Sequence, residues 1–334
     1  MVDLDVLVVG GGAIGGVTAA LMTGQVRRVM VLDANREHVE RMRDPGLELE
    51  VLGETRTVQV DAYSDPSELP VDPQLALVTL KAIYLTAETL NPLRDRVPTF
   101  VSLGNGLVQD RVGSLVGDEK LLIGTVEWGA TNLGPGHLAQ TTRAPFVIGE
   151  PDGSDSERLG QLRAALATVA EVQITDNIRG QVWSKLLLNS TWSGLGAVSG
   201  LLYRDVAEHP LGRRLAVEVW REGVAVGHAQ DLELPDLIGI PAEDISSSDR
   251  EASDRAIDAM MAQLGPTKAS MLQDLERGAR TEVNVINGGV VARGGSHSVP
   301  TPLNEGIVEL VHSYEDGAAQ PSPEAFALLA QRLQ

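Results

Sequence analysis

Asp5-Val6-Leu7-Val8-Val9-Gly10-Gly11-Gly12-Ala13-Ile14-Gly15 is the stretch that decides the fold of this chain. An apolar, valine-rich run leads into Gly10-x-Gly12-x-x-Gly15, and a helical pattern opens with Ala13-Ile14. In such a fingerprint the glycines permit a tight turn and let the backbone approach a pyrophosphate at the positive end of a helix. A second apolar run, residues 29–32, ends in Asp33, and an acid about 20 residues further on accepts hydrogen bonds from the adenosine ribose. Together these features predict a nicotinamide or flavin dinucleotide site at Gly10, Gly12, Ala13, Ile14, Gly15 and Asp33.

Asp33 also bears on the choice of dinucleotide. Its carboxylate repels the 2′-phosphate of NADP, so NAD is the predicted cofactor. Arg36 is close enough to accommodate that phosphate, which keeps NADP as an alternative; it is otherwise a solvated cation at a helix start. Lys81 follows the apolar run 75–80, at the strand end where ligands bind in parallel sheets. It is a candidate to contact the cofactor phosphate or ribose, and otherwise an ordinary strand-end charge.

The first half of the chain alternates short β-rich runs with helical patterns, which is typical of a doubly wound parallel sheet. The expected strands are residues 5–10, 29–33, 75–80 and 99–103, with helices at 13–23 and 35–43. Runs at 121–127, 137–141 and 146–149 are expected to add strands to the same sheet. The fold class is therefore α/β, with a Rossmann-type dinucleotide-binding domain over residues 1–177.

After about residue 177 long segments of helical period replace the strands. The expected helices are 180–198, 212–230, 270–278, 281–292 and 302–314, and the polar stretch 235–253 is expected to be a mobile insert. Residues 178–334 are therefore predicted to form an all-helical C-terminal domain that carries substrate-binding and catalytic residues.

Composition excludes several classes of function. The formal net charge of −19 over 334 residues argues against binding to nucleic acid or an anionic membrane, which needs clustered Lys and Arg. The chain has no cysteine, and its six histidines show no paired ligand spacing, so no metal site is predicted. The apolar start carries Asp3 and Asp5 where an export signal needs positive charge, and no segment has the length of a membrane span. We therefore expect a cytoplasmic protein.

Lys185 stands out because lysine is rare here: the chain has four lysines (Lys81, Lys120, Lys185, Lys268) and 23 arginines. Lysine can give up a proton near neutral pH where its surroundings favour it, and arginine cannot. Lys185 lies in the apolar run 182–189, where it is either a snorkelling side chain or a functional group. Asn189 is four residues on, so on a helix the two share a face about 40° apart. An ammonium beside a carboxamide suits a carbonyl, whose reduction by hydride requires a proton at oxygen.

Two further segments carry candidate groups. Asn105-Gly106 follows the run 99–103 and is either a plain turn or an amide that bridges cofactor and substrate. The segment 270–278, beginning at Ser270, leads to Thr281 and Glu282 at the head of a new helical run, where a capping role is the alternative.

These motifs, in this order along nearly the whole chain, resemble the ketopantoate reductase family. The resemblance rests on Gly10-x-Gly12-Ala13-Ile14-Gly15, Leu80-Lys81-Ala82, Asn105-Gly106-Leu107, Gly134-Pro135-Gly136, Lys185-x-x-x-Asn189, Ser270-Met271-x-Gln273-Asp274 and Thr281-Glu282-x-x-x-Ile286-x-Gly288. The pairing of the Ser-Met-x-Gln-Asp segment with Thr-Glu is the most discriminating part.

The resemblance implies an NAD(P)H-dependent reductase that converts a 2-keto acid to a 2-hydroxy acid, such as 2-dehydropantoate to D-pantoate in pantothenate biosynthesis. It implies that Lys185 is the general acid and that Glu282 binds the substrate hydroxyl and supports the lysine. Asn105, Asn189 and Ser270 would hold the keto acid, with Asn105 and Glu282 also near the cofactor. A homodimer is expected by the same analogy.

Two positions depart from the family pattern. A second asparagine one helical turn after Asn189 is replaced by Ser193, which takes its place as a substrate-binding candidate, and the glutamine before the Asn-Gly turn is replaced by Gly104. With Asp33 favouring NAD, an NAD-dependent D-2-hydroxyacid dehydrogenase of the mandelate type stays open as the alternative. A β-hydroxyacid dehydrogenase shares the Lys-x-x-x-Asn helix but not the segment from Ser270 to Glu282. A dinucleotide-binding regulator without turnover would have no need of a proton donor.

Overall fold

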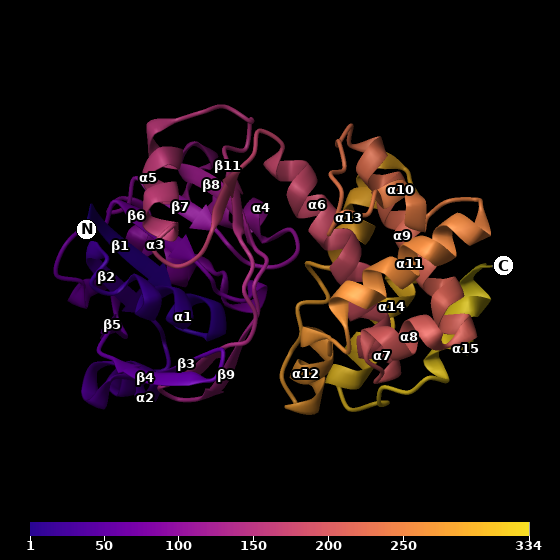
Figure 1. Cartoon of the computed structure of the whole chain (residues 1–334), viewed down its shortest axis with the longest axis horizontal. Helices are drawn as coiled ribbons and strands as arrows, with labels where there is room; N and C mark the ends of the chain where they lie inside the picture. Colours follow the sequence, from indigo (N-terminus) through magenta and orange to yellow (C-terminus); the bar gives the residue numbers. More distant parts are fainter. Residues whose placement is uncertain (334) are drawn as a thin grey trace. The chain divides into compact units, whose positions relative to one another are not determined.

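The computed structural model describes residues 1–333 and divides the chain into two compact units (Figure 1). The first comprises Met1–Gly104 and Val108–Ile178, and the second comprises Asn105–Leu107 together with the chain from Arg179 on. The short segment after Gly104 thus belongs with the helical half of the sequence, although it lies within the α/β half of the chain.

The first unit is built on an eight-stranded sheet with the strand order β12-β11-β8-β7-β6-β1-β2-β5. All neighbouring strands run parallel except β8 and β11, which pair antiparallel. The central strands are fully buried, in keeping with their continuous Val and Leu runs, because helices cover both faces of such a sheet. The predicted α/β class is confirmed, and its strands are β1 Val2–Val9, β2 Val26–Leu32, β5 Asp61–Tyr63, β6 Leu75–Val78, β7 Thr99–Ser102, β8 Leu121–Val126, β11 Phe146–Gly149 and β12 Val172–Ile174.

A second, four-stranded sheet has the order β4-β3-β10-β9. Its strands are β3 Leu47–Val51, β4 Glu54–Val58, β9 Ala130–Gly134 and β10 His137–Gln140. The prediction that residues 137–141 join the main sheet was wrong, because β10 pairs with β3 and β9 instead. Buried Leu138 of β10 packs against helix α1, where a Cβ at Gly16 would lie 2.3 Å from its Cδ1.

The helices of the first unit connect its strands. Among them α1 and α5 pack on β1, whereas α4 packs on β7 and β8. The elements are α1 Ala13–Met22, α2 Arg36–Arg41, η1 Met42–Gly46, η2 Pro66–Glu68, η3 Ala82–Tyr84, α3 Ala87–Arg94, α4 Val108–Val116, η4 Asp118–Lys120 and α5 Glu157–Leu166.

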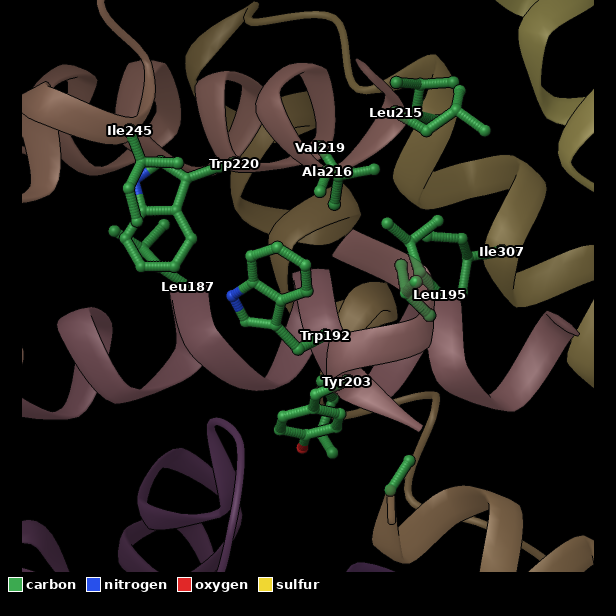
Figure 2. Packing of buried hydrophobic residues seen from close by; sticks show 14 of the residues in the cluster. Leu187, Trp192, Leu195, Tyr203, Leu215, Ala216, Val219, Trp220, Ile245 and Ile307 are labelled. Atoms are coloured by element: carbon green, nitrogen blue, oxygen red, sulfur yellow. The ribbon is translucent and has the colours of Figure 1, made fainter. Parts of the chain in front are cut away.

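In the part that the structure describes, the second unit is built from helices joined by loops, which confirms the predicted class of the C-terminal half. Its elements are α6 Ile178–Leu188, which begins at the last residue of the first unit, η5 Asn189–Ser193, α7 Gly194–Ser199, α8 Tyr203–Glu208, α9 Pro210–Ala229, α10 Ala242–Ile245, α11 Arg250–Leu264, α12 Ser270–Glu276, α13 Asn287–His297, α14 Pro302–Glu315, α15 Ala325–Ala330 and η6 Gln331–Leu333. One π-helical turn, η5, joins α6 to α7. Figure 2 shows Trp192 of this turn packed among apolar side chains from several helices.

Three of the four tryptophans lie in this helical core, and each indole N–H has a partner. Trp183 Nε1 donates to Gly223 O at 3.0 Å, Trp220 Nε1 to Ala242 O at 2.8 Å, and Trp192 Nε1 contacts Met260 Sδ at 3.2 Å. Large aromatic side chains that also satisfy their polar atom stabilise a single packing arrangement. The helix that carries Lys185 therefore packs against this core through Trp183.

Two predictions for this unit were wrong. The stretch 235–253 is not a mobile insert, because Leu237, Ile240 and Ile245 are buried in the helical core. Residues 281–286 are not helical; the helix begins only at Asn287.

Within residues 1–333 no helix combines the length and apolar character that crossing a bilayer requires.

Candidate active site

The conformation of the loop between β1 and α1 requires glycine at Gly10 and at Gly15. Gly10 has a φ of +101°, a conformation that favours glycine. A Cβ at Gly15 would lie 2.0 Å from Gly10 O and 2.3 Å from Thr79 Oγ1, so only glycine permits this turn to close. Thr79 Oγ1 also donates to Gly10 O at 2.7 Å, which holds the loop against β6.

Gly12 differs from the other two glycines because a Cβ there would meet nothing within 4 Å. It is the N-cap of α1 and makes no side-chain cap, and Ala13 and Ile14 form the first turn behind it. The backbone N–H groups of this turn and the helix dipole form an anion site next to open space. The residues present therefore fit a dinucleotide pyrophosphate, and the binding roles expected of Gly10, Gly12, Ala13, Ile14 and Gly15 stay a prediction.

Asp33 follows β2 directly and is held by two backbone donors. Its Oδ2 accepts from Gly11 N at 2.7 Å and its Oδ1 accepts from Asn35 N at 2.8 Å. These bonds fix the carboxylate beside the glycine loop, where it can accept from ribose hydroxyls. Arg36, the first residue of α2, is exposed.

Buried His38 supports the same loop and was missed by sequence reasoning. Its Nε2 lies 2.7 Å from Gly11 O, and its Nδ1 accepts from Gly136 N at 2.8 Å. Because a backbone N–H can only donate, Nδ1 must be unprotonated and Nε2 must carry the hydrogen. His38 thereby ties the glycine loop to the turn before β10. In the sequence, the turn residues Gly134-Pro135-Gly136 were the only sign of this contact. In the structure Gly136 has a φ of +71° and packs against Arg41.

The four lysines lie in different surroundings. Lys120 donates to the carbonyl of Arg94, and Lys268 forms an ion pair with Glu276 at 2.6 Å. Lys81 is half-buried directly before η3, close behind β6, in agreement with its expected position at the ligand-binding edge of the sheet. The remaining lysine is Lys185.

Lys185 lies on α6, and Asn189 is the first residue of the π-helical turn that follows. Both side chains are partly exposed, whereas every residue from 190 to 199 is buried. Lys185 and Asn189 thus lie on one face of the helix just before it enters the core.

The Asn105–Leu107 segment docks against the chain at Glu282–Val285. Leu107 N donates to Val285 O at 3.0 Å, and a Cβ at Gly106, whose φ is +68°, would lie 2.3 Å from that oxygen. Asn105 Nδ2 lies 3.4 Å from Glu282 Oε2, a long hydrogen bond. The structure therefore brings together Asn105 and Glu282, two predicted site residues 177 positions apart in sequence.

Glu282 itself is 7% exposed, and the segment that carries it is anchored by Glu315 of α14. Glu315 Oε1 accepts from Thr281 N at 2.7 Å, and Arg280 pairs with its other oxygen at 2.9 Å. Burial raises the pKa of Glu315, but the hydrogen bonds from Thr281 and the Arg280 guanidinium overcome this and hold the pKa below its ordinary value.

Ser270 and Ser193 have contrasting surroundings. Ser270 is exposed at the first position of α12. Ser193 is 2% exposed, and its hydroxyl is paired with that of buried Tyr203. The substrate-binding role expected of Ser193 stays a prediction, and in this structure its hydroxyl is occupied by Tyr203.

A cluster of possible metal ligands lies on the four-stranded sheet. Within residues 1–333, Glu48, Glu50 and His137 present ligand atoms within 4.8 Å of one another. His137 Nε2 is 2.8 Å from Glu50 Oε1 and 3.7 Å from Glu48 Oε1, so these groups form ion pairs when the imidazole is charged. Sequence spacing could not show this cluster because its residues come from β3 and β10.

Comparison with known proteins gives matches over both halves of the chain. Sequence models described as "Ketopantoate reductase PanE/ApbA" and its C-terminal part match residues 6–153 and 177–315. The chain is 28% identical over 313 residues to the 2-dehydropantoate 2-reductase of Halobacterium salinarum, with 92% of this chain and 98% of that protein covered. It is 27% identical over 333 residues to the enzyme of that name from Mesorhizobium japonicum, with 92% and 97% covered.

Solved structures of the same fold include two informative ones. A PanE/ApbA family ketopantoate reductase from Ralstonia eutropha superposes with a TM-score of 0.80 at 27% identity, covering 94% of this chain and 99% of that one. D-mandelate dehydrogenase with NADH and anilino(oxo)acetate gives a TM-score of 0.82 at 21% identity with the same coverage, a likeness of fold.

Proposed function

Because this chain belongs to the ketopantoate reductase family, we propose that it reduces a 2-keto acid to the 2-hydroxy acid with a nicotinamide dinucleotide. The observation that carries the proposal is that one chain holds both a glycine loop that fits a pyrophosphate and, on α6, Lys185 on the same helix face as Asn189. When bound, the nicotinamide supplies the hydride that reduces C2 of the keto acid.

The protein's own groups complete the reaction by supplying a proton and orienting the substrate. Reduction at C2 places negative charge on the former carbonyl oxygen, and Lys185 Nζ donates the proton that neutralises it. Asn189 orients the keto acid beside Lys185. Glu282, supported by Asn105, accepts a hydrogen bond from the product hydroxyl and provides the counter-charge for the lysine. Ser270 is proposed to lie near the substrate carboxylate.

The proposed substrate is 2-dehydropantoate, the substrate in the names of the curated relatives. Aromatic or branched 2-keto acids of the mandelate type are the alternative, which the fold likeness to D-mandelate dehydrogenase and the carboxylate of Asp33 favour. Purified protein should oxidise the reduced cofactor with one or more acids of a panel that contains both kinds. Binding of the cofactor without turnover of any acid would instead identify a dinucleotide-binding regulator.

We further propose that NADH is preferred over NADPH. Asp33 is fixed by Gly11 N and Asn35 N, so its carboxylate cannot easily move away from an added 2′-phosphate. The ratio of kcat/KM for NADH to kcat/KM for NADPH tests this. We expect a ratio of about 10 or more, because the Asp33 carboxylate repels the 2′-phosphate of NADPH. A preference for NADPH would assign the phosphate to Arg36.

A homodimer is proposed by analogy within the family. Light scattering after size exclusion measures the mass directly, and a value near that of one 35.5 kDa chain would reject this assembly.

A further inference from the structure

The helix that carries Lys185 does not continue with regular α-helical hydrogen bonds. In the π-helical turn η5, Gly194 N donates to Asn189 O and Thr191 O. In an α-helix this N–H would donate to Ser190 O, four residues back. The carbonyl of Ser190 therefore does not receive the N–H of Gly194 and is open to a different donor, and π-turns of this kind are frequent at functional sites.

Asn287 supplies that donor from the start of α13. Its Nδ2 lies 2.8 Å from Ser190 O, and the second hydrogen of the same amide is donated to Asn304 Oδ1 at 2.9 Å. Both asparagines are fully buried. Gly194 provides the space, because a Cβ there would lie 3.0 Å from Asn287 Nδ2 and 3.1 Å from its Oδ1.

Glu222 of α9 fixes the direction of this chain of amides. Its Oε2 accepts from Asn304 Nδ2 at 2.8 Å and from Asn304 N at 3.0 Å, and its Oε1 accepts from Leu303 N at 2.8 Å. Burial raises the pKa of Glu222, and the backbone N–H groups of Leu303 and Asn304 oppose that rise. In its ionised form the carboxylate can only accept, so Asn304 turns its oxygen toward Asn287, and Asn287 turns its nitrogens toward Ser190 and Asn304. The orientation of the amide at the π-turn is thus set from α9.

The amide of Asn287 is present despite an energetic disadvantage. Its Oδ1 is buried and has no hydrogen-bond partner, and leaving such an atom without a partner destabilises a fold. A leucine of similar size would remove that penalty but would leave Ser190 O and Asn304 Oδ1 without this donor. The donors of Asn287 therefore supply something that packing alone does not.

We propose that Asn287 is a positioning residue: it holds the π-helical turn through Ser190 O and so keeps Asn189 on the face of Lys185. The inference rests on the proposed function, since its consequence is the placement of the keto acid. Loss of the amide should let the turn relax and displace the carboxamide of Asn189 while Lys185, one turn earlier on α6, stays in place.

The test compares the full-length protein with Asn287→Ala, Gly194→Ala and Thr191→Val. Thr191→Val is the matched control, because Thr191 lies in the same turn and its buried Oγ1 has no hydrogen-bond partner. Gly194→Ala disturbs the amide by adding a methyl group without removing a polar atom, so it serves if Asn287→Ala fails to fold. For each protein we would measure hydrogen exchange over residues 189–194, the Kd for NADH, and kcat and KM for the keto acid.

Asn287→Ala and Gly194→Ala are expected to raise exchange in the turn and lower kcat/KM about tenfold, mainly through KM, with the Kd for NADH within about twofold of wild type. Thr191→Val should match wild type in all three. Unchanged exchange, normal kcat/KM despite faster exchange, or an equal loss in Thr191→Val would overturn the inference. Failure of the proposed function is separately visible, because it appears as absence of turnover in the wild-type protein.

Discussion

At the scale of single residues, the lysines of this chain fall into different environments. Lys120 donates to a backbone carbonyl, Lys268 pairs with a carboxylate, and Lys185 shares a partly exposed helix face with Asn189. Its rarity among 23 arginines was visible in the sequence, and so was its spacing from Asn189. The sequence did not show that the next turn, which contains Ser193, is buried.

Replacing Lys185 with methionine should separate chemistry from binding. Lys185→Met removes the proton donor and leaves a side chain of similar length, so we expect kcat to fall by about 10²-fold or more while cofactor affinity is kept. Stopped-flow oxidation of the reduced cofactor measures the first quantity and fluorescence titration the second. Lys268→Met is the matched control and should change kcat by less than about twofold. Near-normal turnover in Lys185→Met would remove the lysine from the mechanism.

At the scale of elements, we predict that substitutions of two glycines in the loop from β1 to α1 have different effects, one on stability and the other on cofactor affinity. Gly15→Ala places a methyl group 2.0 Å from Gly10 O, so it should unfold or strongly destabilise the first unit. Gly12→Ala meets no atom within 4 Å, so the melting temperature should stay near that of wild type while the Kd for the cofactor rises at least about tenfold. Thermal unfolding and cofactor titration of both variants check this. Equal effects of the two substitutions on stability would contradict the assignment of Gly12 to the pyrophosphate.

The contact between Glu315 and the Thr281 segment predicts a pH dependence. Because the folded pKa of Glu315 lies below its ordinary value of 4.5, its ionised form stabilises the fold above that pH and the contribution is lost as the pH falls through the folded pKa. Glu315→Gln should therefore lower the free energy of unfolding by about 1–3 kcal/mol at pH 7. The difference between the two proteins should shrink below about pH 4.5. Denaturant unfolding at pH 7 and at a pH well below 4.5 tests this, and a difference that stays constant would show that the charge of Glu315 is not responsible.

The elements that were predicted correctly depend on local pattern. Continuous Val and Leu runs identify the buried strands of the main sheet, and the glycine spacing identifies the first loop. The pairing of β10 with β3 could not be predicted, because period-two alternation identifies a strand but not its partner. The π-turn at Asn189 was equally hidden, since it depends on a donor from Asn287, almost a hundred residues later.

At the scale of the whole molecule, the two units hold different parts of the proposed reaction. The first holds the dinucleotide fingerprint, and the second holds Lys185, Asn189 and Glu282 together with the Asn105–Leu107 segment. The change from strands to helices near residue 177 was predicted from periodicity. The assignment of Asn105–Leu107 to the helical unit was not, because it depends on the contact of Gly106 and Leu107 with Val285 O.

The most direct test of hydride transfer from a nicotinamide to C2 of a 2-keto acid follows the hydrogen itself. The wild-type protein would be incubated with NADH deuterated at both C4 positions and with 2-dehydropantoate or the best acid of the panel. The 2-hydroxy acid would then be examined by mass spectrometry and proton NMR. We predict one deuterium, located at C2, and at least about 10²-fold slower product formation in Lys185→Met. A product without deuterium at C2, or no product from any 2-keto acid while NADH binds, would contradict the account.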